Sequence, residues 1–291
     1  MTLSSSNKIF FGDNLRVLES LPSNSVNLIY IDPPFNTGRR QVRISMSVDR
    51  DDQGDRKGFG GYKYLTKVLG KLSFDDIYDD YLAFLEPRLR EAHRVLTANG
   101  ALYFHIDYRE VHYCKILLDS IFGRDNFLNE IIWAYDYGGR SKRKWPTKHD
   151  NILYYVKDRN NYVFNADEID RLPYMAPSLV GGDKAKLGKL PTDVWWQTIV
   201  SPTGKEKTGY PTQKPLAILE RIIRASSCPG DIVLDFFAGS GTTGVAAHKL
   251  GRSFILVDNN EEAIRVMRSR FRDVPVEFIT LEDYKYEDKA V

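Results

Sequence analysis

The chain has 291 residues, of which 42% are hydrophobic and 27% are charged, and its formal net charge at pH 7 is +2. These values are typical of a soluble globular protein with one large α/β domain, or with one domain that carries an insertion. No apolar run approaches the roughly 18–20 residues of a membrane span, the N-terminus lacks a signal-peptide pattern, and the two cysteines have no metal-binding spacing. We therefore expect a cytoplasmic protein without a membrane partner or a metal site.

Predicted strands and helices alternate along the chain, which favours a parallel sheet with helices on its faces. The hydrophobic patterns predict strands at residues 8–11, 28–31, 101–106, 129–134, 151–156, 232–235 and 253–257, and helices at 15–21, 74–98, 111–121, 216–225, 245–250 and 261–271. Two polar stretches interrupt this alternation. Residues 36–73 are expected to form a mobile loop near a candidate site or, as the alternative, a disordered insertion, and residues 136–212 form a basic, irregular insert.

The first candidate site is the segment Asp32-Pro33-Pro34-Phe35, which directly follows the predicted strand at 28–31. The prolines fix φ and donate no backbone hydrogen bond, and Asp32 precedes a proline, which keeps the segment extended. The result is a stiff corner, rich in hydrogen-bond acceptors, with an aromatic ring beside it. Such a corner suits a flat ring that carries an amino group, whereas the alternative interpretation is an ordinary turn at the end of a strand.

The second candidate site is the segment Gly239-Ser240-Gly241-Thr242-Thr243-Gly244, which fits G-x-G-x-x-G between a predicted strand and a predicted helix. Asp258 ends the next strand, where a ribose hydroxyl is normally bound. The pattern predicts a nucleotide cofactor, of which NAD is the first candidate. Asp235 and the rings of Phe236 and Phe237 favour S-adenosylmethionine instead, because a carboxylate there suits an amino group and a sulfonium but repels a pyrophosphate.

With both motifs present, the chain resembles the DNA amino-methyltransferases of the permuted β group, in which a [D/N/S]-P-P-[F/Y/W] motif precedes the cofactor glycine loop. Two further segments carry the resemblance, Gly12-Asp13-Asn14-Leu15 and Gly209-Tyr210-Pro211-Thr212-Gln213-Lys214-Pro215. One departure is Tyr210, where many relatives have histidine, and we expect little consequence. The resemblance implies a single circularly permuted methyltransferase domain over residues 1–291, with a Rossmann-like α/β sheet of about seven mostly parallel strands, flanking helices and a target-recognition insert at 136–212.

The resemblance also implies a reaction, the transfer of a methyl group from S-adenosylmethionine to the exocyclic amine of a base flipped out of duplex DNA. Asp32 and the carbonyl of Pro33 would accept hydrogen bonds from the amine, and Phe35 would stack on the base. Pro34 completes the implied catalytic set. Within the family, aspartate at the first motif position goes mostly with adenine and serine mostly with cytosine. We therefore expect N6 of adenine as the target, with N4 of cytosine as the alternative.

The resemblance assigns a larger set of residues to the cofactor. These residues are Asp13, Lys214, Asp235, Phe236, Phe237, Ala238, Gly239, Ser240, Gly241, Thr242, Thr243, Asp258 and Asn259. Asp13 would contact the adenine end, for which capping of the helix near Leu15 is an equal alternative. Lys214 would lie near the methionine carboxylate or order the site.

A basic run in the insert is predicted to contact DNA phosphates rather than to form a solvated loop, because it contains no acid and includes Trp145. Its members are Arg140, Lys142, Arg143, Lys144 and Lys148. His105 and Asp107, in contrast, are interpreted as satisfied polar groups at the end of a strand.

Two other functions compete with this interpretation. If the chain were an NAD-dependent oxidoreductase, the presence of Asp235 and of the motif at Asp32 would be unexplained. If it were a non-catalytic DNA-binding protein, neither motif would need to be intact. Double-stranded DNA is the expected partner, and the protein is expected to come from a bacterial or archaeal cell or to be encoded by a phage. A homodimer and a cognate restriction endonuclease are further partners that the resemblance allows and that no motif of the sequence tests.

Overall fold

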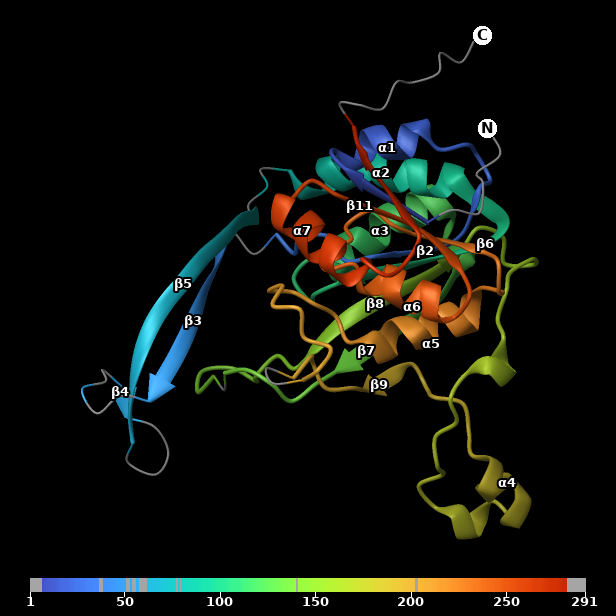
Figure 1. Cartoon of the computed structure of the whole chain (residues 1–291). Coiled ribbons are helices and arrows are strands. Elements are labelled where there is room, and N and C mark those ends of the chain that lie inside the picture. The colour runs from blue at the N-terminus through green and yellow to red at the C-terminus, as the bar shows by residue number, and fades with distance from the viewer. Residues whose placement is uncertain are drawn as a thin grey trace. The chain divides into compact units, whose positions relative to one another are not determined.

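The structure is a computed structural model of the chain (Figure 1). It describes residues 7–281 except 37–38, 51–52, 54–55, 58–61, 77, 79, 140 and 202–203. The chain forms two compact units, of which the first comprises Met1–Pro33 and Leu82–Val291 and the second comprises Pro34–Tyr81. The first unit holds a large α/β sheet, and the second holds a small antiparallel sheet.

Among the described residues, nine strands form the large sheet in the order β12-β1-β11-β10-β2-β6-β8-β7-β9. All neighbours from β12 to β6 run parallel, whereas β8 is antiparallel to both β6 and β7, and β9 is parallel to β7. The strands are β1 (Asn7–Phe11), β2 (Val26–Ile31), β6 (Leu96–Ile106), β7 (Phe127–Ala134), β8 (His149–Val156), β9 (Val194–Trp196), β10 (Ile232–Asp235), β11 (Ser253–Asp258) and β12 (Val276–Thr280).

Helices cover both faces of this sheet, which is why its central strands are apolar runs rather than alternating patterns. On one face, Tyr30, Tyr103 and Tyr154 belong to a buried cluster with residues of α5, α6 and α7. On the other face, the ring of Tyr155 packs against Phe122 of α3 with 5.6 Å between the centroids. Figure 1 shows α1 and α2 on the side of α3. The α-helices are α1 (Asn14–Ser20), α2 (Tyr81–Val95), α3 (Val111–Phe122), α4 (Gly182–Leu187), α5 (Leu216–Ser226), α6 (Thr242–Lys249) and α7 (Glu261–Arg270), and short 3-10 helices lie at Arg124–Asn126, Ala166–Glu168 and Pro177–Leu179.

The second unit corrects the expected loop at 36–73. It contains β3 (Arg39–Arg50), β4 (Arg56–Lys57) and β5 (Lys63–Asp76), which pair antiparallel in the order β3-β5-β4. The sequence carries the signal for β3, because apolar residues occupy every second position from Val42 to Val48. The high content of charge and glycine obscured this period. The mobility of the segment stays a prediction.

Two further differences concern the ends of one helix and the number of strands in the sheet. The helix expected at 74–98 begins at Tyr81 and ends at Val95, because Phe74 belongs to β5 and Leu96 is already paired with Val26 in β6. The sheet exceeds the expected seven strands because β9 and β12 were not predicted, and β9 has only three residues, too few to show a period. Within the described ranges, no helix is both long and apolar enough to cross a membrane.

Candidate active site

Three aspartates of the predicted site lie at one edge of the large sheet. The neighbouring parallel strands β11, β10, β2 and β6 all end at this edge. Asp258 ends β11, Asp235 ends β10, and Asp32 follows β2 directly. Ligands of open α/β sheets bind at the carboxyl ends of the strands, so the topology brings both sequence motifs to the expected place.

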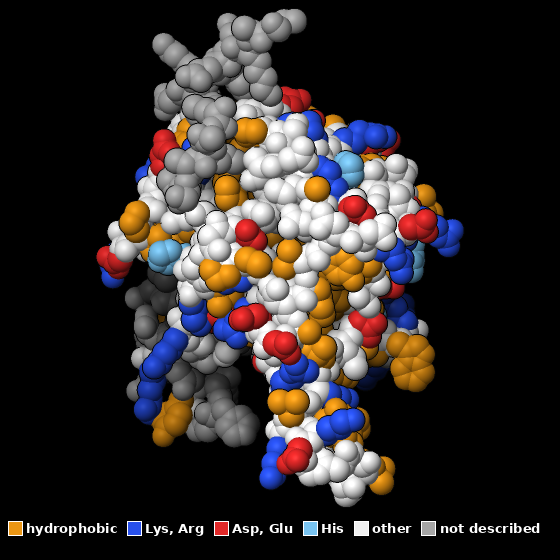
Figure 2. Space-filling view, turned by 90° about the vertical axis from the view of Figure 1, so that its right-hand side faces the viewer, with side chains coloured by type: hydrophobic (Ala, Val, Ile, Leu, Met, Phe, Trp, Pro, Cys, Tyr) orange, Lys and Arg blue, Asp and Glu red, His pale blue; other side chains and the backbone are white. Residues whose placement is uncertain are grey.

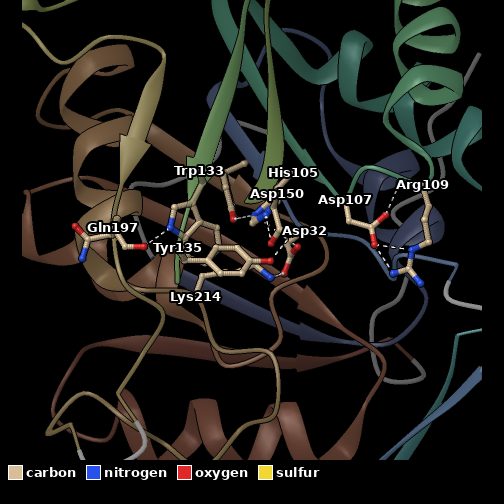
Figure 3. Close-up of polar contacts among 10 residues, drawn as sticks. Asp32, His105, Asp107, Arg109, Trp133, Tyr135, Asp150, Gln197 and Lys214 are labelled. Carbon is tan, nitrogen blue, oxygen red and sulfur yellow. Dashed lines mark hydrogen bonds and ion pairs between the residues drawn. The ribbon is translucent and has the colours of Figure 1, made fainter. Parts of the chain in front are cut away.

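Asp32 is held by two basic side chains that come from distant parts of the chain (Figure 3). The ammonium of Lys214 lies 2.7 Å from Oδ2 of Asp32, and Nδ1 of His105 lies 3.6 Å from Oδ1. The Asp32 side chain is 15% exposed. Its Oδ1 atom is buried and accepts no hydrogen bond from the part of the chain that the structure describes. One oxygen of the carboxylate is therefore anchored, and the other has capacity for a donor.

His105 lies one residue before the end of β6, inside a buried polar network. Its Nδ1 atom lies 2.8 Å from the hydroxyl of Tyr30, and its Nε2 atom lies 3.3 Å from Oδ2 of Asp150. The hydroxyl of Tyr135 donates to Oδ1 of Asp150 at 3.1 Å. Burial alone would raise the pKa of Asp150, but the hydrogen bond and the charge of His105 lower it below its ordinary value. Asp150 is therefore a carboxylate that holds His105 in place.

The pair of His105 and Asp107 separates in the structure. Asp107 turns away and accepts from the guanidinium of Arg109, with 2.7 Å between Arg109 Nε and Asp107 Oδ2. Both side chains have partners, as the sequence analysis expected. The position of His105 beside Asp32 was not predicted, and a buried histidine at the end of a strand next to the motif strand is the signal that could have found it.

The first motif continues across the boundary of the two units. Pro33 is buried at the edge of the first unit. Pro34 and Phe35 begin the second unit, where the hydroxyl of Tyr81 donates to the carbonyl oxygen of Pro34 at 2.6 Å. The stacking role of Phe35 stays a prediction.

The glycine loop, residues 239–244, follows β10 as predicted and leads into α6. Gly241 has φ +75°, and a Cβ atom there would lie 2.8 Å from Cγ of Met267, so only glycine fits without a shift. Gly239 has φ +51°, and a Cβ atom there would lie 3.1 Å from the ring of Tyr210. The segment with Tyr210 and Lys214 thus packs on the loop and also reaches Asp32.

Asp235 and Asp258 both accept hydrogen bonds from backbone N–H groups at the same edge of the sheet. Asp235 accepts from the hydroxyl of Thr243 at 2.6 Å and from the N–H of Phe237 at 3.0 Å, and burial raises its pKa to about 7. Asp258 accepts from the N–H of Gly239 at 2.7 Å, and burial raises its pKa to about 6. Both carboxylates therefore fix the shape of the glycine loop, a role that the sequence did not indicate.

The N-terminal segment contacts the same loop through Asn14, a residue that the sequence analysis did not single out. Its side-chain amide donates to the carbonyl oxygen of Phe236 at 2.8 Å, and its Oδ1 accepts from Nε of Arg88 at 2.6 Å. Asp13 caps α1 by accepting from the N–H of Arg16 at 3.1 Å, which confirms the capping alternative. A contact of Asp13 with the adenine end of a cofactor stays a prediction.

The basic run lies in the loop that joins β7 to β8, at the edge where Asp32 lies, because Asn151 near the start of β8 pairs with Ile106 at the end of β6. Lys142, Arg143 and Lys144 are exposed. Trp145 beside them is 93% exposed. Lys148 instead donates to carbonyl oxygens within the loop, at 2.6 and 2.9 Å, and so shapes it. Arg140 lies outside the described residues.

The remainder of the predicted insert leaves from the opposite edge, because β8 ends at Val156, which pairs with Ala101. It includes an arm, residues 172–189, that is closed by a backbone bridge between Leu172 and Lys189 and contains α4. Hydrophobic and charged side chains are mixed on the surface of this arm (Figure 2). The expected insert at 136–212 thus divides into a basic loop at one edge of the sheet and an arm at the opposite edge, and it also contains β8 and β9.

Comparisons with known proteins identify the family of this chain. A family model described as DNA methylase (N6_N4_Mtase) matches residues 26–269. DNA adenine methyltransferase YhdJ of Escherichia coli (strain K12) is 33% identical over 271 residues, which cover 89% of this chain and 80% of that protein. Type II methyltransferase M.HpaI of Haemophilus parainfluenzae is 32% identical over 263 residues, which cover 90% of this chain and 73% of that protein.

Solved structures with the same fold include the M1.HpyAVI–SAM complex, with a TM-score of 0.56, 23% identity and coverage of 91% of this chain and 98% of that chain. PvuII DNA methyltransferase (cytosine-N4-specific) has a TM-score of 0.58, 16% identity and coverage of 94% and 96%. At these identities the likeness concerns the fold alone, and it confirms the predicted α/β architecture. The match of the family model over most of the chain, together with the identity to YhdJ, shows that this chain belongs to the DNA methylase family.

Proposed function

We propose that this chain is a site-specific methyltransferase that transfers a methyl group from S-adenosylmethionine to the N6 amine of adenine in duplex DNA. The observation that carries the proposal is the buried Oδ1 atom of Asp32, to which no described residue donates a hydrogen bond. A buried acceptor without a donor is unfavourable, and a ligand N–H group satisfies it. The exocyclic amine of a base that has left the stack is such a donor.

The glycine loop fits S-adenosylmethionine better than a dinucleotide. A pyrophosphate needs free backbone N–H groups at the loop. Of the N–H groups of this loop, those of Gly239 and Gly241 already donate to acceptors within the protein, which leaves a pyrophosphate only those nearer the start of α6. The carboxylates of Asp235 and Asp258 at the same loop would repel a phosphate and suit the amino and hydroxyl groups of S-adenosylmethionine.

The residues at the sheet edge would act by positioning and by charge. When bound, S-adenosylmethionine supplies a methyl group on a positively charged sulfur. Asp32 would accept one N–H of the amine on Oδ1, and the carbonyl of Pro33 would accept the other, so that the lone pair of the nitrogen is directed at the methyl group. As the nitrogen gains the methyl group it must lose one proton, which would pass to Oδ1 of Asp32 along this hydrogen bond. Lys214 would hold Asp32 through Oδ2, where the distance is 2.7 Å. No covalent nucleophile is needed.

The choice of adenine rests on Asp32 as the first residue of its motif and on the similarity to YhdJ, which is named a DNA adenine methyltransferase. Cytosine N4 presents the same kind of amine, and the solved PvuII structure with this fold is named cytosine-N4-specific. The test below therefore distinguishes the two bases. A homodimer and a cognate restriction endonuclease remain predicted partners.

Incubation with labelled S-adenosylmethionine and mixed-sequence duplex DNA, followed by nucleoside analysis, tests the reaction. We expect label in N6-methyl-2′-deoxyadenosine, and label in N4-methyl-2′-deoxycytidine would contradict the choice of base. Asp32→Ala should lower transfer by about 10²–10³-fold, because it removes the acceptor for the amine. Asp107→Ala is the matched control, since Asp107 lies at the same edge but pairs with Arg109. Full activity of the Asp32 variant would refute the mechanism.

The exposed basic loop is the proposed contact for DNA phosphates. Replacing Lys142, Arg143 and Lys144 together by alanine should weaken DNA binding and reduce the slope of log K against log salt by up to about 2–3, since each phosphate contact contributes about 0.9. The matched control replaces Lys184, Lys186 and Lys189 of the arm, which leaves from the opposite edge. Equal losses in both triple variants would show that the binding reports net charge rather than this loop. Titrations at several salt concentrations measure the slopes.

A further inference from the structure

His105 occupies a position behind Asp32 that the proposed function does not use. It is 0% exposed and comes from β6, the neighbour of β2. One buried imidazole thus lies between two carboxylates, with Oδ1 of Asp32 at 3.6 Å from Nδ1 and Oδ2 of Asp150 at 3.3 Å from Nε2 (Figure 3). A buried ionisable side chain beside a proposed catalytic group is a candidate for a role in the reaction.

We propose that His105 is a positioning residue for methyl transfer, which keeps the Asp32 carboxylate in the orientation that directs Oδ1 at the amine of the target base. The inference rests on the proposed function, because it concerns the acceptor which that function requires. It goes beyond that function by assigning the orientation of Asp32 to a residue of another strand that touches neither base nor cofactor.

The contact with Lys214 does not by itself fix this orientation. A carboxylate turns about its Cβ–Cγ bond in a broad, two-fold well. Lys214 approaches Oδ2 at 2.7 Å with a compact charge on a flexible four-carbon stem, so it anchors Oδ2 but does not fix the rotation of the carboxylate that sets the direction of Oδ1. A group that restrains Oδ1 must be rigid and must lie on the other side. The imidazole of His105 meets both conditions.

The ring of His105 is rigid because its neighbours hold it on three sides. The Tyr30 hydroxyl contacts Nδ1 at 2.8 Å, and Asp150 contacts Nε2. The ring of Trp133 packs against it edge-on, with 5.6 Å between the centroids. Tyr135 in turn donates to Asp150 and fixes that carboxylate. Such second-layer contacts hold a reacting group within the small tolerance that catalysis requires.

Two substitutions at one position separate orientation from packing. His105→Phe keeps a ring in the pocket and removes both nitrogens, whereas His105→Asn places an amide nitrogen near the site of Nδ1 and keeps a polar contact for Asp32. His112→Phe, at an exposed histidine of α3, is the matched control. Each full-length variant is studied by crystallography without ligands, and by kcat and by the dissociation constant for S-adenosylmethionine.

We expect the carboxylate of Asp32 to turn in His105→Phe and to keep its place in His105→Asn. The value of kcat should fall by about 10²-fold in His105→Phe, because a misplacement of about 1 Å has an effect of this size, and should recover in part in His105→Asn. The dissociation constant for S-adenosylmethionine should change less than twofold in both variants.

Three results would overturn the inference. They are an unmoved Asp32 carboxylate in His105→Phe, a kcat within twofold of the wild type, or a loss of kcat that the loss of cofactor affinity matches. If the wild-type protein transfers no methyl group, the proposed function fails, whereas the position of Asp32 in the His105→Phe crystal still decides whether His105 orients it.

Discussion

Three aspartates follow or end adjacent strands at one edge of the sheet, yet they make different bonds. Asp235 and Asp258, beside the glycine loop, accept hydrogen bonds from the protein on both oxygens. Asp32 has an ion pair with Lys214 on Oδ2, whereas Oδ1, 3.6 Å from Nδ1 of His105, accepts no hydrogen bond from the described residues. Aspartates in equivalent positions are thus of two kinds: one kind builds the loop, and the other has an oxygen available to a ligand.

After Asp32 itself, Lys214 is the residue whose substitution should have the largest effect on activity. The resemblance assigns Lys214 to the cofactor, whereas the structure pairs it with Asp32. Lys214→Met removes the ammonium 2.7 Å from Oδ2 and keeps the length of the side chain. We expect kcat to fall by about 10²-fold, since an acceptor carboxylate without its charged partner is no longer held in place. The dissociation constant for S-adenosylmethionine should rise much less. Isothermal titration and steady-state kinetics separate the two quantities.

The matched control is Lys205→Met, at an exposed lysine of the same segment. It should leave both quantities unchanged. If the Lys214 variant loses cofactor affinity but keeps kcat at saturating cofactor, Lys214 is a cofactor-binding residue. The contrast between the two kinds of aspartate would then be weaker.

The sequence revealed those parts of the site whose signal is local. Asp32 and the glycine loop each stand within a few residues of an apolar strand, so the motif and its place at a strand end are read together. The network of Asp32 with His105, Asp150 and Lys214 is not local, because it depends on which strands pair. The antiparallel return of β8 beside β6 brings Asp150 to the end of β6, and no pattern within either strand specifies this pairing.

The same difference between local and non-local signals explains which parts of the fold the sequence predicted. The alternation of strands and helices predicted the parallel sheet, since each helix carries its own period and each central strand is a short apolar run. The antiparallel pair of β3 and β5 was missed although β3 has a clear period of two, because charge and glycine content outweighed it in the interpretation. The sequence also did not predict that the insert divides into a loop and an arm, because this division depends on where β8 begins and ends.

A substitution of Asp235 tests the aspartates that hold the glycine loop. Its expected effect is smaller and concerns stability rather than turnover. Burial raises the pKa of its carboxyl to about 7. The native state therefore holds this proton over a pH range in which the unfolded chain, with an ordinary pKa of about 4, has released it. The stability that the proton provides is present at low pH and is lost as the pH rises through 7.

Asp235→Asn should remove this dependence, because an amide stays neutral. Its Oδ1 atom still accepts from the N–H of Phe237, and its amide can donate to the hydroxyl of Thr243, where the carboxylate now accepts at 2.6 Å. We expect the variant to exceed the wild type in free energy of unfolding by about 2 kcal/mol at pH 8 and by much less at pH 5. Urea titrations at both pH values, with Asp273→Asn as the exposed control, measure the difference. A variant less stable than the wild type at pH 8 would mean that the loop requires the charge itself, and Asp235 would then join Asp32 as a carboxylate that acts by its charge.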